Sequence, residues 1–313
     1  MKTILSIDGG GIRGLLPALV LAQIEARLNC PIAKCFDLIA GTSTGGILAL
    51  GLAKDDGQGV PQYSAQALVD MYEQHGKEIF PRSLWRGVSS VGGLLDEAYP
   101  HKGLELILKQ YFNDEPLGAS LTRLLLTTYD IHNRKPLFLK SWRLEHHTVL
   151  MRHAARATSA APTYFEPAHI PVDGAKRALV DGGVFINSPS VSAYAEAQRI
   201  YPEESEFMLV SLGTGELNRP IELHDAKDWG KAGWVAPLLS CIFDGVADAA
   251  DYQMDKLLGD NYYRLQTTLD IASDDMDDVT NGNIANLKSE GNKLLEASTA
   301  ELDALCQRLA DKN

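Results

Sequence analysis

Ser43 has the sequence surroundings of a catalytic nucleophile. It lies in the segment Gly41-Thr42-Ser43-Thr44-Gly45, between the largely apolar runs 36–40 and 46–53. This is the G-x-S-x-G pattern of a nucleophile elbow, a sharp turn between a strand and a helix that exposes one serine hydroxyl. We expect glycine at both flanking positions because the serine backbone is strained, and side chains there would collide with the neighbouring strand and helix. The helix that begins after the elbow directs the positive end of its dipole toward negative charge developing at Ser43.

A second glycine-rich segment follows the short apolar strand expected over residues 3–7. It reads Asp8-Gly9-Gly10-Gly11-Ile12-Arg13-Gly14 and precedes a helix expected over 14–28. Consecutive glycines allow several backbone N–H groups to point toward one anion. The segment fits two anions. One is a nucleotide phosphate, because 9–14 matches G-x-G-x-x-G, and the other is the oxyanion of a tetrahedral acyl intermediate.

The order of the elements favours the oxyanion. A dinucleotide site needs a second parallel strand that ends in an acidic residue about 20 residues after the last glycine. Here the next strand begins with Asp37 and ends at the serine elbow, so the acid is at the wrong end. A P-loop is excluded because neither loop ends in Gly-Lys-Ser/Thr. We therefore predict an oxyanion hole formed by the N–H groups of Gly10 and Gly11, in a loop that also contains Gly9, Arg13 and Gly14.

Three motifs in this order resemble the patatin-like phospholipase family: segments 8–14, 41–46 and Asp181-Gly182-Gly183. The stretches 157–165 and 209–215 support the likeness, which extends from about residue 3 to about residue 267. The resemblance implies a three-layer α/β/α sandwich with a mostly parallel central sheet, and a Ser–Asp dyad that cleaves acyl esters of lipids without a catalytic histidine or cofactor. One departure is Ser188, where many members have a second Asn, and it leaves the dyad assignment intact.

Two Asp-Gly pairs formally fit the base position of that dyad. Asp173-Gly174 lies between two short segments in a context typical of a tight hairpin turn. Asp181 instead follows the apolar strand 178–180, so it lies at a strand's carboxyl end, where open α/β sheets place their ligands. We therefore predict that Asp181 takes the proton of Ser43 in the first step of an acyl transfer and acts again as base when water attacks the acyl-enzyme, and that Asp173 serves the turn. Asp8 is expected to fix the glycine loop by accepting N–H bonds.

Three other hypotheses remain. The first is an α/β-hydrolase triad in the order Ser43, Asp181, His224, although that fold normally builds several strands before its elbow and only one precedes the elbow strand here. The second is a ligand-gated phospholipase effector, silent until a small-molecule activator such as a cyclic nucleotide binds, because the family includes antiviral effectors of this kind. The third is a non-catalytic module that binds lipid or a dinucleotide.

The composition limits the classes of binding partner that the protein can have. The 313 residues carry a net charge of −12, which argues against nucleic acid polymers and against electrostatic docking on anionic membranes. If the substrate is a lipid or phospholipid ester, we expect the protein to contact the membrane transiently through an apolar rim. Trp85 with the stretch 87–93 is the best candidate for that rim. The alternative is that Trp85 packs on the core beneath a loop. The sequence shows no membrane-spanning run and no signal peptide. Its four cysteines lack C-x-x-C spacing, so we expect a cytoplasmic protein, peripheral to the membrane.

The pattern of apolar residues predicts one α/β domain over 1–313. Strands alternate with helices, which indicates a mostly parallel sheet covered on both faces. The acid-rich segment 270–278 lacks calcium-loop spacing and is expected to be a solvated linker, followed by a C-terminal bracing helix. The expected strands are 3–7, 36–41, 123–130, 136–140, 178–180, 207–212 and 262–267, and the expected helices are 14–28, 45–54, 64–79, 101–112, 149–158, 190–200, 236–258 and 284–310.

Overall fold

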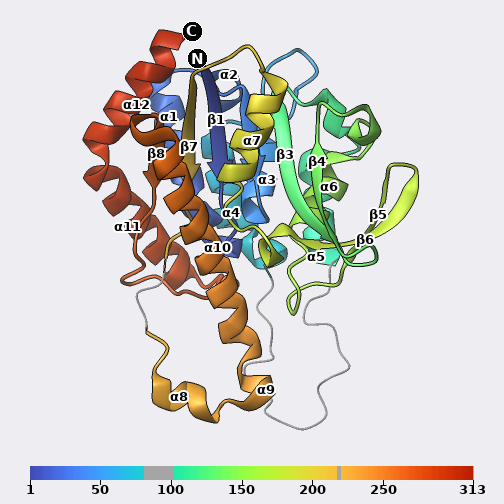
Figure 1. The fold of residues 1–313 in the computed structure, drawn as a ribbon, viewed down its shortest axis with the longest axis vertical. Coiled ribbons are helices and arrows are strands. Elements are labelled where there is room, and N and C mark those ends of the chain that lie inside the picture. The colour runs from blue at the N-terminus through green and yellow to red at the C-terminus, as the bar shows by residue number, and fades with distance from the viewer. Residues whose placement is uncertain (81–101, 217–219, 313) are drawn as a thin grey trace.

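The computed structural model describes residues 1–80, 102–216 and 220–312 (Figure 1). The apolar rim predicted at Trp85 and 87–93 lies outside these ranges. Within them, no helix is long and apolar enough to cross a membrane. The helices are α1 Leu15–Leu28, α2 Ile32–Cys35, α3 Thr44–Ala53, α4 Ala65–Ile79, α5 Lys102–Phe112, α6 Met151–Thr158, α7 Ser190–Ile200, α8 Leu223–Asp228, α9 Gly230–Gly233, α10 Val235–Leu258, α11 Asn281–Ala297 and α12 Thr299–Lys312.

The described residues form an eight-stranded mixed sheet in the order β5-β6-β3-β2-β1-β7-β8, with β4 also paired to β3. Strands β3, β2, β1, β7 and β8 are parallel neighbours. Strands β4, β5 and β6 run antiparallel to their partners. The strands are β1 Lys2–Ile7, β2 Leu38–Gly41, β3 Arg123–Asp130, β4 Lys135–Lys140, β5 Ala168–Val172, β6 Ala175–Asp181, β7 Phe207–Leu212 and β8 Tyr262–Leu265.

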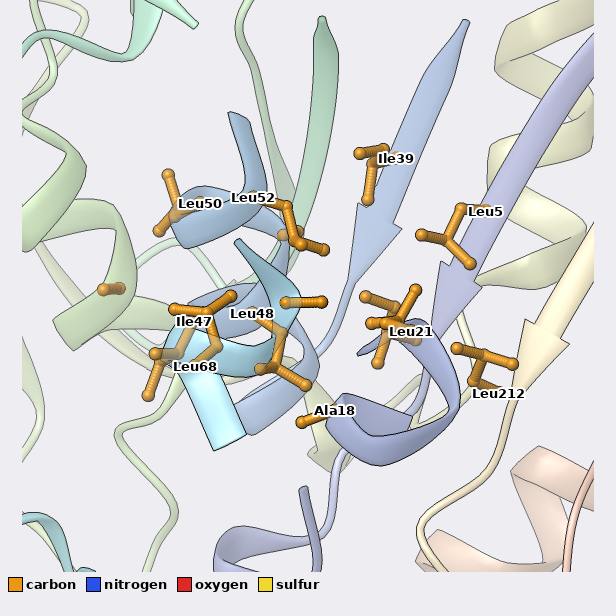
Figure 2. Packing of buried hydrophobic residues seen from close by; sticks show 14 of the residues in the cluster. Leu5, Ala18, Leu21, Ile39, Ile47, Leu48, Leu50, Leu52, Leu68 and Leu212 are labelled. Carbon is orange, nitrogen blue, oxygen red and sulfur yellow. The ribbon is translucent and has the colours of Figure 1, made fainter. Parts of the chain in front are cut away.

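Helices cover both faces of this sheet because successive strand residues point to opposite sides. Leu5 and Ile39 belong to the core that includes α1, α3 and α4. Their neighbours Ile4 and Leu38 belong to a second core that includes α7 and α10. Figure 2 shows the first core, where Leu21 of α1 lies against the sheet. The three-layer α/β/α class predicted from the sequence is confirmed.

The C-terminal brace differs from its prediction in one respect. The helix expected over 284–310 is two helices, α11 and α12, that meet at Ser298. The hydroxyl of Thr299 contacts the last carbonyls of α11 at Leu295 (3.0 Å) and Glu296 (2.9 Å), which satisfies the helix end. Both helices pack against α1 (Figure 1) and extend the first core.

The acidic segment 270–278 is not the solvated linker predicted from its composition. The carboxylate of Glu290 on α11 accepts the N–H groups of Asp270 (3.1 Å) and Ile271 (2.9 Å). The side chain of Asn283 accepts the N–H of Ser273 at 2.7 Å. Because side chains of α11 replace water as its hydrogen-bond partners, the segment is held against the protein and reaches the glycine-rich loop.

Leu302→Ala is expected to lower the free energy of unfolding by about 2–5 kcal/mol, because the leucine is fully buried between α12 and the first core. Urea denaturation followed by circular dichroism measures the change. Leu144→Ala, at an exposed leucine, is the control and should stay within about 0.5 kcal/mol of the wild type. An equal loss in both variants would contradict a bracing role.

Candidate active site

The carboxyl ends of β2 and β6 meet end to end along one side of β3. Gly41, the last residue of β2, pairs with Leu126, and Asp181, the last residue of β6, pairs with Thr128. Strand β4 occupies the other side of β3 over the same residues. Asp181 therefore lies at the carboxyl end of its strand, as predicted, but that strand is not one of the parallel strands. β6 is antiparallel to β3, and Asp181 and Ser43 come together because β2 and β6 approach from opposite directions.

The elbow at Ser43 has the strained backbone that its sequence predicts. Ser43 has φ 55° and ψ −123°, a conformation that residues other than glycine rarely adopt. A Cβ at Gly41 would lie 2.3 Å from the carbonyl oxygen of Gly45, and one at Gly45 would lie 2.2 Å from that of Ile7. Both flanking positions therefore require glycine. The N–H of Ser43 donates to the hydroxyl of Thr158 at 3.0 Å, which ties the elbow to the end of α6.

The two threonines of the elbow hold it from either side. The Thr42 hydroxyl donates to the carbonyl of Ile186 at 3.0 Å and accepts from the Thr127 hydroxyl at 2.8 Å. The Thr44 hydroxyl is hydrogen-bonded to the buried hydroxyl of Tyr72. Neither threonine lines the cavity in front of Ser43. Their placement supports a structural role.

Asp181 is buried beside Ser43, and the Ser43 hydroxyl acts to lower the pKa of its carboxyl group. The N–H of Gly183 donates to Asp181 Oδ1 at 2.7 Å and fixes the carboxylate. Burial raises the pKa of Asp181 to about 7, although the bonds from Ser43 and Gly183 oppose this shift. At Gly182 a Cβ would lie 2.0 Å from Thr127 Oγ1, so the turn after Asp181 requires glycine.

The glycine-rich loop places two unused N–H groups beside Ser43. The carbonyl of Gly9 accepts a hydrogen bond from the Thr214 hydroxyl at 2.7 Å. The N–H of Gly9 donates to the carbonyl of Asn187 at 3.2 Å. Within the described ranges, the N–H groups of Gly10 and Gly11 have no acceptor. Both glycines line a cavity with Ser43 and Asp181.

Arg13 and Gly14 lie behind this loop. The buried Arg13 side chain donates from Nε to the carbonyl of Gly10 and from Nη1 to that of Gly215, both at 3.4 Å. This placement supports a role for Arg13 in steadying the loop. A Cβ at Gly14 would lie 2.3 Å from Thr44 Oγ1, so glycine lets the loop approach the elbow.

Asp8 forms an ion pair with Arg264, which is far away in the sequence. We expected it to accept N–H bonds from the glycine loop, but Arg264 Nη2 lies 2.7 Å from its Oδ2. Nη1 of the same guanidinium donates to the Ser211 hydroxyl at 2.8 Å. Burial raises the pKa of Asp8 and the charge of Arg264 opposes that rise. The ion pair fixes the junction between β1 and the loop.

The remaining predicted residues lie elsewhere. Asp173 and Gly174 form the turn between β5 and β6 with φ 53° and 73°, which confirms the predicted hairpin. Asp173 contacts Arg177 at 3.4 Å. His224 is exposed on α8 and does not line the cavity.

The cavity in front of Ser43 has a largely apolar wall. Met276, from the segment 270–278, closes one side, because its carbonyl accepts the N–H of Ile12 at 2.9 Å. Among the described residues, no group of three or more His, Cys, Asp or Glu is arranged to hold a metal ion. Besides Gly10, Gly11, Ser43 and Asp181, the cavity is lined by Phe80, Ser159, Ala161, Tyr164, Phe165, Asn187, Phe243, Met276 and Asp277.

Several residues of this site have no sequence signal of their own. Thr158 and Thr214 lie in stretches that carry the family resemblance, and Asn187 precedes Ser188, where this sequence departs from the family. Arg264 and Met276 lie outside every motif, so only their contacts reveal them.

Comparison with known proteins identifies the family. The model of the patatin-like phospholipase family matches residues 5–194. Patatin-like protein 2 of Oryza sativa subsp. indica is 32% identical over 349 aligned residues, covering 97% of this chain and 86% of the rice protein. Patatin-04/09 of Solanum tuberosum is 29% identical, covering 95% and 84%. The solved structure of human GIVD cytosolic phospholipase A2 has a TM-score of 0.46 at 11% identity, covering 98% of this chain and 60% of that one.

The chain therefore belongs to the patatin-like phospholipase family. This membership confirms the resemblance drawn from the three motifs. It also identifies the chain as an enzyme of the acyl-hydrolase class.

Asp181→Asn is expected to gain stability over the wild type as the pH rises from about 4 to about 7. The Asp181 pKa is about 7 when folded against 3.8 normally, so in this window the native chain binds more protons than the unfolded chain. The wild-type free energy of unfolding then falls with rising pH, whereas asparagine does not titrate. Unfolding midpoints of both proteins at pH 4, 5.5, 7 and 8 measure this. A constant difference would contradict the raised pKa.

Arg264→Met is expected to destabilise the protein by about 3–5 kcal/mol, because it leaves the Asp8 carboxylate buried without its partner. Adding Asp8→Asn removes the uncompensated charge and should recover more than half of that loss. Urea denaturation of the wild type, both single variants and the double variant measures the coupling. Additive losses would show that the two side chains act independently.

Proposed function

We propose that the chain is a lipid acyl hydrolase of the phospholipase A or esterase type, with Ser43 as nucleophile and Asp181 as general base. One observation carries the proposal. A serine on a strained elbow shares a cavity with a buried carboxyl group whose pKa is raised to about 7, and both face a loop with two unused N–H groups. Nucleophile, base and oxyanion donors are the parts that acyl transfer requires.

In the first step, Ser43 Oγ attacks the carbonyl carbon of the ester while Asp181 accepts the hydroxyl proton. The carbonyl oxygen becomes an oxyanion, which the N–H groups of Gly10 and Gly11 stabilise. The tetrahedral intermediate then collapses, the C–O bond to the alcohol breaks, and Asp181 returns the proton to the leaving alkoxide. The product alcohol departs and the acyl group stays on Ser43.

In the second step, water replaces the alcohol. Asp181 takes a proton from water, whose oxygen attacks the acyl carbon, and the same two N–H groups hold the second oxyanion. Breakage of the acyl–Oγ bond releases the fatty acid and returns the proton from Asp181 to Ser43. A base with a pKa near 7 can accept and return a proton at neutral pH, which an ordinary aspartate near 3.9 does poorly.

The cavity wall supports a lipid as the acyl donor. Phe80, Phe165, Phe243 and Met276 give an apolar surface next to Ser43, which suits a hydrocarbon chain. The hydrolase triad has no comparable support, because His224 is exposed on α8 outside the cavity lining. The Ser–Asp dyad is therefore the mechanism that we propose, at a membrane surface contacted only transiently and without a cofactor.

Asp181→Asn is expected to lower kcat by about 10⁴, by analogy with the loss of a triad member, because the amide cannot accept the serine proton. Ser43→Ala should abolish turnover, and a fluorophosphonate should label the wild type at Ser43 alone. Hydrolysis of a p-nitrophenyl ester and mass spectrometry of labelled peptides are the measurements. Labelling at another serine would reject the assignment.

Two matched variants serve as controls. Asp173→Asn should keep nearly full activity because asparagine suits the same tight turn, and His224→Ala should do so because no imidazole takes part in the proton transfer. If His224→Ala were as inactive as Asp181→Asn, a Ser-Asp-His triad would replace the dyad. A wild type that hydrolyses the ester only after a cyclic dinucleotide is added would identify a ligand-gated effector.

A further inference from the structure

Exposed apolar side chains gather at one end of the molecule. Of the eleven large apolar residues that are exposed in the described ranges, four lie between 221 and 238. Single exposed apolar residues are ordinary on a protein surface, but a local group indicates an interaction site. We call the segment 221–238 the apolar tip. Its exposed apolar residues are Ile221 (45% exposed), Leu223 (70%), Trp234 (38%) and Leu238 (49%).

The tip projects from the body of the molecule. Helices α8 and α9 and the beginning of α10 extend beyond the sheet at the end opposite the two chain termini (Figure 1). Strand β1 runs toward this same end (Figure 1), so the tip lies on the side where β1 enters the glycine-rich loop. Inside the tip, the ring of Trp229 packs edge-on against Trp234, with centroids 5.2 Å apart.

Helix α10 connects the tip to the catalytic cavity. Its later part packs against the body through a buried stripe that begins at Phe243 and continues through Ala247, Ala250 and Met254. Phe243 also lines the cavity in front of Ser43. Leu238 precedes Phe243 by five residues, which is about 7.5 Å along a helix. The same helix thus carries both a residue of the apolar tip and a residue of the cavity wall.

We propose that the apolar tip docks on the surface of a zwitterionic phospholipid bilayer and brings the cavity to its substrate. This inference rests on the proposed function, since it supplies the surface from which a lipid ester reaches Ser43. Tryptophan and leucine side chains are among the residues that insert at such an interface. The tip carries exposed charges of both signs, such as Glu222 and Lys227, and the chain carries a net charge of −12. A zwitterionic surface therefore suits it better than an anionic one.

The test is binding to phosphatidylcholine vesicles in the Ser43→Ala background, so that lipid is not consumed. The tip variant Leu223→Gln/Leu238→Gln should bind at least about 10-fold more weakly than its parent, because two large apolar side chains lose their insertion. The matched control is Leu144→Gln/Leu257→Gln, which alters two comparably exposed leucines outside the tip (80% and 58%). It should bind like the parent in vesicle co-sedimentation.

Several outcomes would overturn the proposal: no binding of the parent, equal binding by parent and tip variant, or an equal loss in the control. Binding to anionic vesicles alone would also overturn it, as would a dimer of the parent that the tip variant dissociates without lipid. Circular dichroism verifies folding, and Ile221→Gln, outside any helix, replaces the double variant if that one unfolds. Ester hydrolysis retained in Ser43→Ala would reject the proposed function without affecting the vesicle result.

Discussion

The active-site geometry depends on two strands that end against each other along β3. β2 pairs with the first half of β3 and β6 with its last residues, from the opposite direction. Both chains must turn away sharply where they meet, beside Thr127. Thr127 bonds to Thr42 on one side and leaves no room for a side chain at Gly182 on the other. The strained elbow and the turn after Asp181 both follow from the meeting of these two strand ends.

Two buried aspartates near Ser43 both have a raised pKa but differ in their partners. Asp8 has a guanidinium 2.7 Å away that offsets the cost of burying its charge. Asp181 accepts the N–H of Gly183 and, among the described residues, has no cationic partner; its pKa is raised to about 7. An ion pair suits a carboxylate that holds a loop in place, whereas a buried carboxyl group without a cationic partner suits the base that we propose. The burial of Asp181 without a cationic partner lowers the stability of the fold near neutral pH, as expected for a functional site.

The segments that close the site come from distant parts of the chain. Met276 covers the glycine-rich loop because α11 holds the segment 270–278 through Glu290 and Asn283. Phe243 reaches the cavity from α10, the helix that also carries part of the apolar tip. The C-terminal third of the chain is therefore part of the site, although none of the catalytic motifs lies in it.

The sequence by itself determined the features that depend on local sterics and periodicity. Glycines at 41 and 45, the Asp173 turn and the strand–helix alternation could all be predicted, because each is set by residues adjacent in the chain. Only the tertiary structure decided that β6 is antiparallel, that Arg264 is the partner of Asp8, and that 270–278 is held against α11 rather than solvated. These features depend on contacts between residues far apart in the sequence, whose pairing no local pattern encodes.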